Sequence, residues 1–223
     1  MATALDAPPK MKIEGERRFL LPGVGWEGYE ALLGIVGDRL PRITYDRGDL
    51  ELMSPSSDHE RFKRLLGRLV ETVTEVLRIP CQGLGSTTWR KKLKDRGLEP
   101  DECYYLARFP QVRGKRTIDL SVDPAPDLAI EVEISRSALD RMGIYAALGV
   151  PEVWRFDGET LRIAQLQPDG TYAESDRSPG LPMLPPAEVV RWLGLAEEMG
   201  QTPWIRQFRA WVREALAPGF EEG

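Results

Sequence analysis

Acidic side chains fall on one face of a predicted strand in the segment PDLAIEVEIS, residues 126–135. Apolar residues occupy alternate positions of this segment, and the positions between them include Asp127, Glu131 and Glu133. Because successive side chains of a strand point to opposite faces, these acids would share one face. Either that face simply contacts water, or its carboxylates take part in chemistry.

Two further acids favour a chemical role. Glu60 falls in the first turn of a predicted helix, and Asp101 follows a proline at the start of another predicted strand. Carboxylates from adjacent strands and a helix end can converge on one hard cation, leaving positions for water and a phosphate oxygen. A cation would also relieve the repulsion between neighbouring acids. We therefore take Glu60, Asp101 and Glu131 as candidate metal ligands.

The composition narrows the choice of metal. His59 is the single histidine in 223 residues, which excludes a multi-histidine site and favours Mg²⁺ or Mn²⁺ over zinc.

Cys81 and Cys103 have neither metal-ligand spacing nor the density of a disulfide scaffold, so we expect two reduced thiols. A net charge of −5 argues against tight, non-specific binding of nucleic acid by the protein as a whole.

The sequence predicts one main domain. Hydrophobic residues make up 42% of the chain, enough for a substantial core. No apolar run approaches the roughly 20 residues of a membrane span, and no signal-peptide pattern is present, so we expect a cytoplasmic protein. The charged, proline-containing segment 1–19 is predicted to be a flexible lead-in. The domains are assigned as 1–14 for the lead-in, 15–199 for the main domain, and 200–223 for a carboxy-terminal helix and tail.

Residue periodicity predicts a mixed α/β domain. Predicted helices cover 26–40, 56–79, 136–149, 185–199 and 202–216. Predicted strands cover 42–55 as a hairpin, 81–93, 101–109, 117–123, 126–135, 152–158 and 160–175. Strands grouped between helices, with little regular βαβ alternation, are typical of the α+β style.

The last predicted helix carries an apolar stripe. Its members are Trp204, Phe208, Trp211, Val212 and Ala215. Such a stripe usually docks on the core of its own domain. The alternative is a homodimer interface, because two-fold symmetry is the commonest form of assembly.

The order of these motifs resembles the PD-(D/E)XK nuclease superfamily, and within it the Uma-type restriction endonuclease family. The segments that carry the resemblance are 53–69, 85–89, 97–106, 126–135 and 144–158, so that it covers about residues 15–193. The resemblance implies a restriction-endonuclease-like core, in which helices flank a mixed central β-sheet. It also implies a Mg²⁺-dependent endonuclease that hydrolyses phosphodiester bonds, with DNA as the expected substrate.

The resemblance also assigns residues. By position, Asp101 matches the aspartate of the family motif, Glu131 its glutamate, and Glu60 the helical acid that completes the metal shell. Asp101, Glu131 and Glu133 are accordingly the candidate catalytic residues. The motif has a lysine two positions after its glutamate, where this chain has Glu133. An acid there could bind a second cation, or it could mark an inactive site.

Another element could supply the missing positive charge. Lys91, Lys92 and Arg141 are the candidates, each able to neutralise charge near the reacting phosphate. If none does so, the alternative is a non-catalytic binding or assembly module that retains the nuclease fold.

Three further residues and one basic run remain open. His59 could contact phosphate or a metal-bound water, although a surface or capping histidine is the simpler interpretation. Tyr145 could line the cleft or pack in the core, and Asp127 is another candidate lining residue. The run RKKLKDR, 90–96, follows Trp89 and could bind backbone phosphates or form a solvated hairpin tip.

Overall fold

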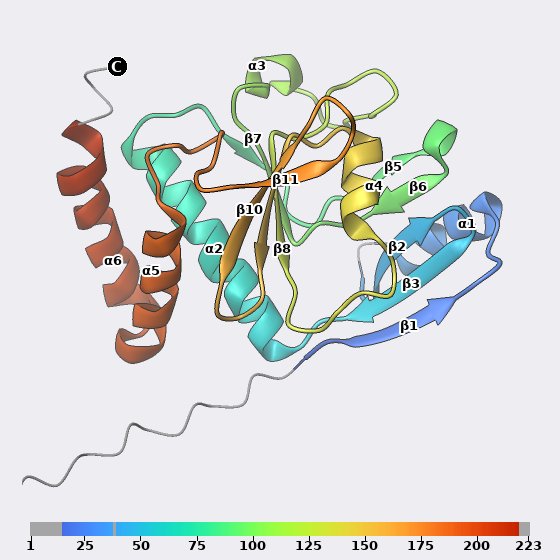
Figure 1. Ribbon diagram of the computed structural model, residues 1–223, viewed down its shortest axis with the longest axis horizontal. Helices are drawn as coiled ribbons and strands as arrows, with labels where there is room; N and C mark the ends of the chain where they lie inside the picture. The colour runs from blue at the N-terminus through green and yellow to red at the C-terminus, as the bar shows by residue number, and fades with distance from the viewer. Residues whose placement is uncertain (1–14, 38, 219–223) are drawn as a thin grey trace, which may run out of the picture.

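Two β-sheets lie beside each other in the computed structural model, which describes residues 15–37 and 39–218 (Figure 1). Sheet A has the order β1-β3-β2-β6-β5 and sheet B the order β11-β10-β9-β8-β7-β4. Sheet A consists of β1 (Arg17–Leu21), β2 (Arg42–Asp46), β3 (Asp49–Ser54), β5 (Trp89–Lys91) and β6 (Arg96–Leu98). Sheet B consists of β4 (Gln82–Gly83), β7 (Glu102–Tyr105), β8 (Leu128–Val132), β9 (Glu152–Phe156), β10 (Leu161–Leu166) and β11 (Tyr172–Ser175).

Sheet B is mixed, as the family resemblance implied. Strands β8 and β9 pair in parallel, whereas β7–β8, β9–β10, β10–β11 and β4–β7 pair antiparallel. A parallel pair needs a crossover connection, and α4 (Arg141–Leu148) provides it between β8 and β9. The remaining helices are α1 (Trp26–Val36), α2 (Ser57–Val76), α3 (Phe109–Val112), α5 (Pro186–Met199) and α6 (Gln201–Trp211), and a 3₁₀ turn covers Lys92–Lys94. Within the described ranges, no helix combines the length and the apolar composition needed to cross a membrane.

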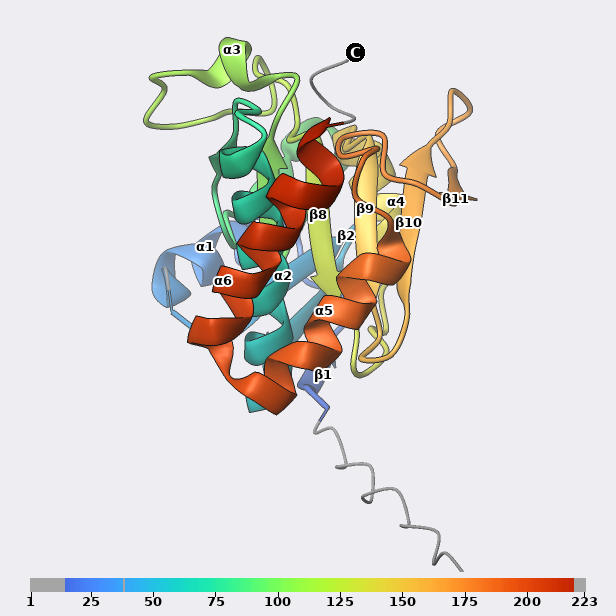
Figure 2. The same ribbon diagram turned by 90° about the vertical axis from the view of Figure 1, so that its left-hand side faces the viewer.

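Helices α2 and α5 cover one face of sheet B, and α6 packs against both of these helices (Figure 2). Helix α2 begins after Ser56, whose hydroxyl accepts a hydrogen bond from the His59 N–H at 3.1 Å. Its apolar stripe contacts the Leu128, Ile130 and Val132 side chains of β8 in the largest core cluster. The start of α2 is therefore fixed beside the carboxyl end of β8.

The opposite face of β8 is buried too. Ala129 packs with Ile144, Tyr145 and Leu148 of α4 in a second core cluster, and all five residues of β8 are buried. The interpretation of a half-exposed strand with acids in water is therefore wrong. Glu131 projects into the interior, on the side of α4.

Sequence patterns mispredicted two elements of the centre. Segment 117–123 forms turns rather than a strand, because the Asp119 carboxylate accepts the Ser121 N–H at 2.8 Å and Asp123 accepts the Asp119 N–H at 3.0 Å. The helix predicted over 136–149 begins only at Arg141, since the Asp140 side chain caps it by accepting the Gly143 N–H.

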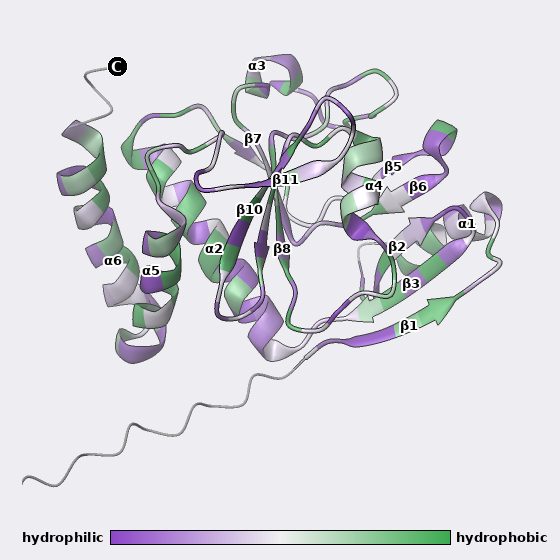
Figure 3. Ribbon diagram, in the orientation of Figure 1, coloured by the Kyte–Doolittle hydropathy of each residue, from purple (hydrophilic) through white to green (hydrophobic). Residues whose placement is uncertain are grey.

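The predicted lead-in over 1–19 is also wrong for its last residues. Strand β1 pairs antiparallel with β3, from Arg17 opposite Ser54 to Leu21 opposite Leu50. It forms the edge of sheet A, and its exposed Phe19, Leu20 and Leu21 give that end of the ribbon its hydrophobic colour in Figure 3. Residues 1–14 lie outside the described ranges.

A π-helical stretch, Val212–Leu216, ends the last helix and changes its buried face. Trp204, Phe208 and Val212 are buried against α2 and α5, as their spacing predicted. The extra residue per turn then buries Leu216 and exposes Ala215, which an α-helical stripe would have buried.

Candidate active site

Asp101 is fixed against β8 by backbone hydrogen bonds. It immediately precedes β7, and its N–H donates to the Ile130 carbonyl at 3.1 Å. Its Oδ2 accepts the Val132 N–H at 2.6 Å. The aspartate thus continues the pairing of β7 with β8, which places its carboxylate beside Glu131 at 1% exposure.

The other oxygen of Asp101 contacts two cations. Arg42 of β2 donates to Oδ1, and the Nε2 atom of His59 lies 2.8 Å from the same oxygen. Burial alone would raise the pKa of Asp101, but the hydrogen bond and charge of His59, with the charge of Arg42, hold that pKa well below its usual range. Asp101 is therefore ionised.

His59 is completely buried, so the interpretation of a surface histidine is wrong. Its Nδ1 atom lies 2.7 Å from Oε1 of Glu16. Burial disfavours the charged ring, but hydrogen bonds with Asp101 and Glu16 outweigh burial and raise the pKa of His59 to about 9. The ring is thus a cation at neutral pH that donates to both carboxylates.

Glu16 belongs to this site although sequence reasoning missed it. It accepts the N–H groups of Ile134 at 3.2 Å and Ser135 at 2.6 Å, in the loop after β8. Burial would raise the pKa of Glu16, but hydrogen bonds from His59 and Ser135 lower it to about 2. Its local sequence carries no signal of this role, because the groups that hydrogen-bond to its side chain, in His59, Ile134 and Ser135, are distant in the chain.

Glu131 is paired with Arg141 of α4. The Nη2 atom of Arg141 lies 2.5 Å from Oε1 of Glu131, and the hydroxyl of Tyr145 donates to the same oxygen. Burial raises the pKa of Glu131, the charge of Arg141 opposes that rise, and the neighbouring Asp101 adds to it. Arg141 also donates to the Glu99 carbonyl and to the Thr44 hydroxyl, so it links both sheets.

The other predicted site residues lie outside the buried pair of Asp101 and Glu131. Glu60 is 47% exposed and accepts a hydrogen bond from Arg42 at 2.5 Å, at the rim of the site. Glu133 forms a two-point pair with Arg155, at 2.9 and 2.8 Å, and makes no hydrogen bond with the other acids. Lys91 and Lys92 line a separate groove and are not brought to Asp101 or Glu131.

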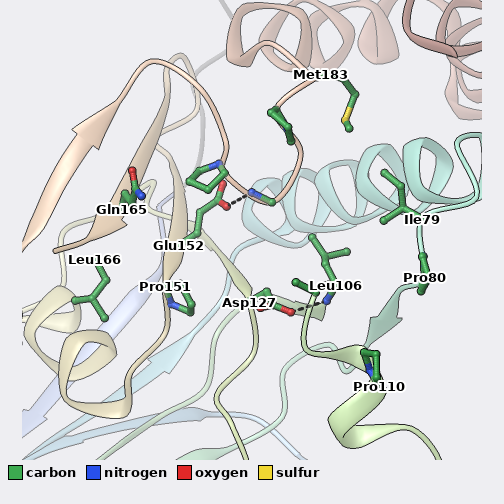
Figure 4. A pocket seen from close by; sticks show the side chains of 14 residues that line it. Ile79, Pro80, Leu106, Pro110, Asp127, Pro151, Glu152, Gln165, Leu166 and Met183 are labelled. Atoms are coloured by element: carbon green, nitrogen blue, oxygen red, sulfur yellow. Dashed lines mark hydrogen bonds between the residues drawn. The ribbon is translucent and has the colours of Figure 1, made fainter. Parts of the chain in front are cut away.

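Asp127 lies at the other end of β8, about 13 Å along the strand from Glu131. Its Oδ2 accepts the N–H groups of Leu106 at 2.7 Å and Arg108 at 2.9 Å. It lines an apolar pocket of about 610 Å³, together with Glu152 (Figure 4). Asp127 is therefore not part of the same site.

A cleft of about 640 Å³ opens beside Arg42. Arg42, Glu60, Lys63, Ser86 and Glu99 are among the residues that line it. Lys63 donates to the Ser86 hydroxyl at 3.0 Å, and this hydroxyl donates to the Asp101 carbonyl at 3.3 Å. Arg42 both lines the cleft and contacts Asp101, so it lies between the cleft and the buried carboxylate.

The oxygen ligands suit Mg²⁺ or Mn²⁺ in type but not in number. Within the described part of the chain, no three aspartate, glutamate, histidine or cysteine side chains are grouped so that they could hold a metal ion. Mg²⁺ commonly uses only one or two protein carboxylates, together with water and substrate phosphate. Asp101 and Glu131 are two such carboxylates, and hydrogen-bond donors occupy both oxygens of Asp101 and Oε1 of Glu131.

Comparison with known proteins identifies the family. The model of the Uma2 family, described as "Putative restriction endonuclease", matches residues 26–198. The chain belongs to this family. Its Uma2 membership confirms the resemblance expected from the motifs and supports a nuclease role. The match leaves out β1, Glu16 and α6.

The solved structures that are similar to this Uma2 member include a nuclease-like protein. It is described as a "putative nuclease belonging to DUF820", from Anabaena variabilis ATCC 29413. The two share 16% sequence identity with a TM-score of 0.49, over 69% of this chain and 92% of the other. No curated protein matches the sequence.

Proposed function

We propose that the protein is a metal-dependent endonuclease that hydrolyses phosphodiester bonds in DNA. The observation that carries this proposal is the position of Asp101 and Glu131. The two acids lie at the start of β7 and in β8 and are almost fully buried, and Arg42, which contacts Asp101, also lines a cleft together with Glu60 and Lys63. A pair of buried acids next to an open, partly basic cleft suits the binding of a cation and a phosphate together.

In this proposal each side chain has a separate role. Asp101 and Glu131 hold Mg²⁺ or Mn²⁺, and Glu60 approaches from the rim. The bound cation would polarise the phosphoryl oxygen and lower the pKa of the attacking water. His59 and Glu16 fix the orientation of the Asp101 carboxylate. Lys63 contributes positive charge to the cleft where the phosphate would bind.

Arg141 takes the place of the lysine that the family motif leads one to expect. Its guanidinium lies 2.5 Å from Glu131 and is held by two further acceptors, so its position is rigid. Such a fixed cation can stabilise negative charge that develops in the transition state. Glu133 has its own partner in Arg155, so it does not neutralise Arg141.

A non-catalytic module with the same fold is the second candidate. The observation that favours it is that Asp101 and Glu131 are already paired with guanidinium groups, which occupy the oxygens a cation would use. In that case the cleft would bind a partner without cutting it.

Cleavage of supercoiled plasmid in Mg²⁺ or Mn²⁺ distinguishes the two candidates. We expect the native protein to nick the DNA, with loss of nicking in EDTA and in Asp101→Asn and Glu131→Gln. The matched control is Glu174→Gln, which removes an exposed acid of β11 and should leave nicking unchanged. Equal nicking by Asp101→Asn and the native protein would overturn the endonuclease proposal.

A further inference from the structure

A second groove, of about 720 Å³, adjoins the cleft. Segment 84–93, which includes β5, forms one side, and segment 115–121 before β8 forms the other. Leu84, Thr87 and Thr88 line both the groove and the cleft, so the two lie next to each other. We call this feature the basic groove and define it by its five cations, Arg90, Lys91, Lys92, Lys115 and Arg116.

Among the residues that the structure describes, three cations of the basic groove have no acidic partner. Arg90 pairs with Glu30 at 3.1 Å, and Lys115 pairs with Asp123. Lys91, Lys92 and Arg116, by contrast, form no ion pair within residues 15–37 and 39–218. A concentration of unpaired positive charge on a chain of net charge −5 indicates a surface for a polyanion.

The form of the groove favours a duplex over a single strand. Proteins that bind single strands stack the bases on exposed aromatic rings. Here Trp89 is buried, and Trp26 packs edge-on against Tyr29 and Tyr45. The groove therefore offers cations without a free stacking surface.

The tip of the β5–β6 hairpin is also suited to a duplex. The side chain of Leu93 is 90% exposed and stands between Lys92 and Lys94. In DNA-binding proteins, such an apolar side chain can insert into a groove of the duplex while the flanking cations contact the adjacent phosphates. The hairpin, at the right of Figure 1, projects from sheet A beside α4.

We propose that the basic groove binds the backbone of duplex DNA next to the cleft, with Lys91, Lys92 and Arg116 as phosphate contacts. This inference rests on the proposed function, since it supplies the surface that would hold the substrate while Asp101 and Glu131 act. It also gives Lys91 and Lys92 a role in binding, separate from the active-site role first considered for them.

Equilibrium binding of a short labelled DNA duplex, measured by fluorescence anisotropy in EDTA, tests the proposal without any cleavage. We expect the triple variant Lys91→Gln, Lys92→Gln, Arg116→Gln to bind about 100-fold more weakly at ~0.1 M salt. The slope of log affinity against log salt should fall by about 2 to 3. The matched control is Arg177→Gln, Arg206→Gln, Arg213→Gln, which removes three exposed cations elsewhere and should bind like the native protein.

The result separates this proposal from the proposed function. If the triple variant binds as tightly as the native protein, or if an RNA duplex binds more tightly than DNA, the basic groove is not the DNA surface. Plasmid nicking, measured in parallel, reports on the endonuclease proposal by itself. Asp101→Asn should lose nicking but keep native binding and native salt dependence. Circular dichroism melting of each variant checks that it is folded.

Discussion

The Nε2 atom of His59 lies 2.8 Å from Oδ1 of Asp101, and both side chains are buried. The other ring nitrogen contacts Glu16, so the histidine is held from both sides. A cation placed between two carboxylates stabilises the ionised form of each. The orientation of Asp101 thus depends on Glu16, which lies outside the part of the chain matched by the family.

Glu16→Gln should therefore make the free energy of unfolding depend less on pH in the acidic range. The pKa of Glu16 falls from 4.5 to about 2 on folding, so its stabilising effect is present above pH 4.5 and is lost as the pH falls toward 2. We expect the variant to be about 2 kcal/mol less stable than the native protein at neutral pH, and the difference to shrink below pH 4.5. Urea unfolding across this pH range measures it. A difference that stays constant with pH would contradict the assignment.

Arg42→Met should increase the effect of Mn²⁺ on thermal stability. Arg42 contacts both Asp101 and Glu60, and its removal leaves the buried Asp101 carboxylate with His59 as its remaining cationic partner, at a cost of up to about 3–5 kcal/mol. A metal cation that binds Asp101 would recover part of this lost stability. The rise in melting temperature caused by Mn²⁺ should then be larger in Arg42→Met than in the native protein.

Scanning fluorimetry with and without Mn²⁺ measures that rise. Arg155→Met is the control, because Arg155 pairs with Glu133 and not with Asp101. An equal Mn²⁺ effect in all three proteins would show that the metal binds elsewhere.

Arg141 and Glu131 should be strongly coupled. Arg141→Met leaves Glu131 buried without its counter-charge, which we expect to cost about 3–5 kcal/mol. Removing both charges, in Glu131→Gln with Arg141→Met, should cost less than the sum of the single changes by more than about 1 kcal/mol. A double-mutant cycle from urea unfolding gives this coupling, and simple additivity would be the contrary result.

Two substitutions test which side chains the π-helical stretch Val212–Leu216 buries. Leu216→Ala should lower the free energy of unfolding by about 2 kcal/mol, because Leu216 packs in the main core. Ala215→Ser should change it by less than about 0.5 kcal/mol, because Ala215 is exposed. The reverse order of effects would mean that the α-helical stripe predicted from the sequence is the correct one.

Local patterns predicted the elements that carry the acids. Alternation in 126–135 and the aspartate after Pro100 indicated β8 and β7, because side-chain periodicity records which face is buried. The same alternation could not show that β8 is buried on both faces, since its acids suggested water. Only the packing of α4 explains why Glu131 is internal.

The partners of the acids could not be predicted in the same way. Arg42 and Glu16 lie 59 and 43 residues from the groups they contact, Asp101 and His59, and contacts over such separations leave no periodic pattern. Arg141 was one of three candidates for the missing charge, because sequence spacing gave no reason to prefer it over Lys91 or Lys92. Its pairing with Glu131 depends on the turn that brings α4 back onto β8.

The contact between Arg42 and Asp101 has a consequence for how the chain folds. Arg42 belongs to sheet A, and Asp101 is bound to sheet B. Without sheet B, Arg42 would lose Asp101, and without sheet A, Asp101 would keep His59 but lose Arg42, so each sheet would bury a charge that is less well compensated. We therefore expect the docking of the two sheets and the burial of these charges to occur together. The amide hydrogen of Val132, bound to Asp101, should exchange with solvent only when the whole domain opens.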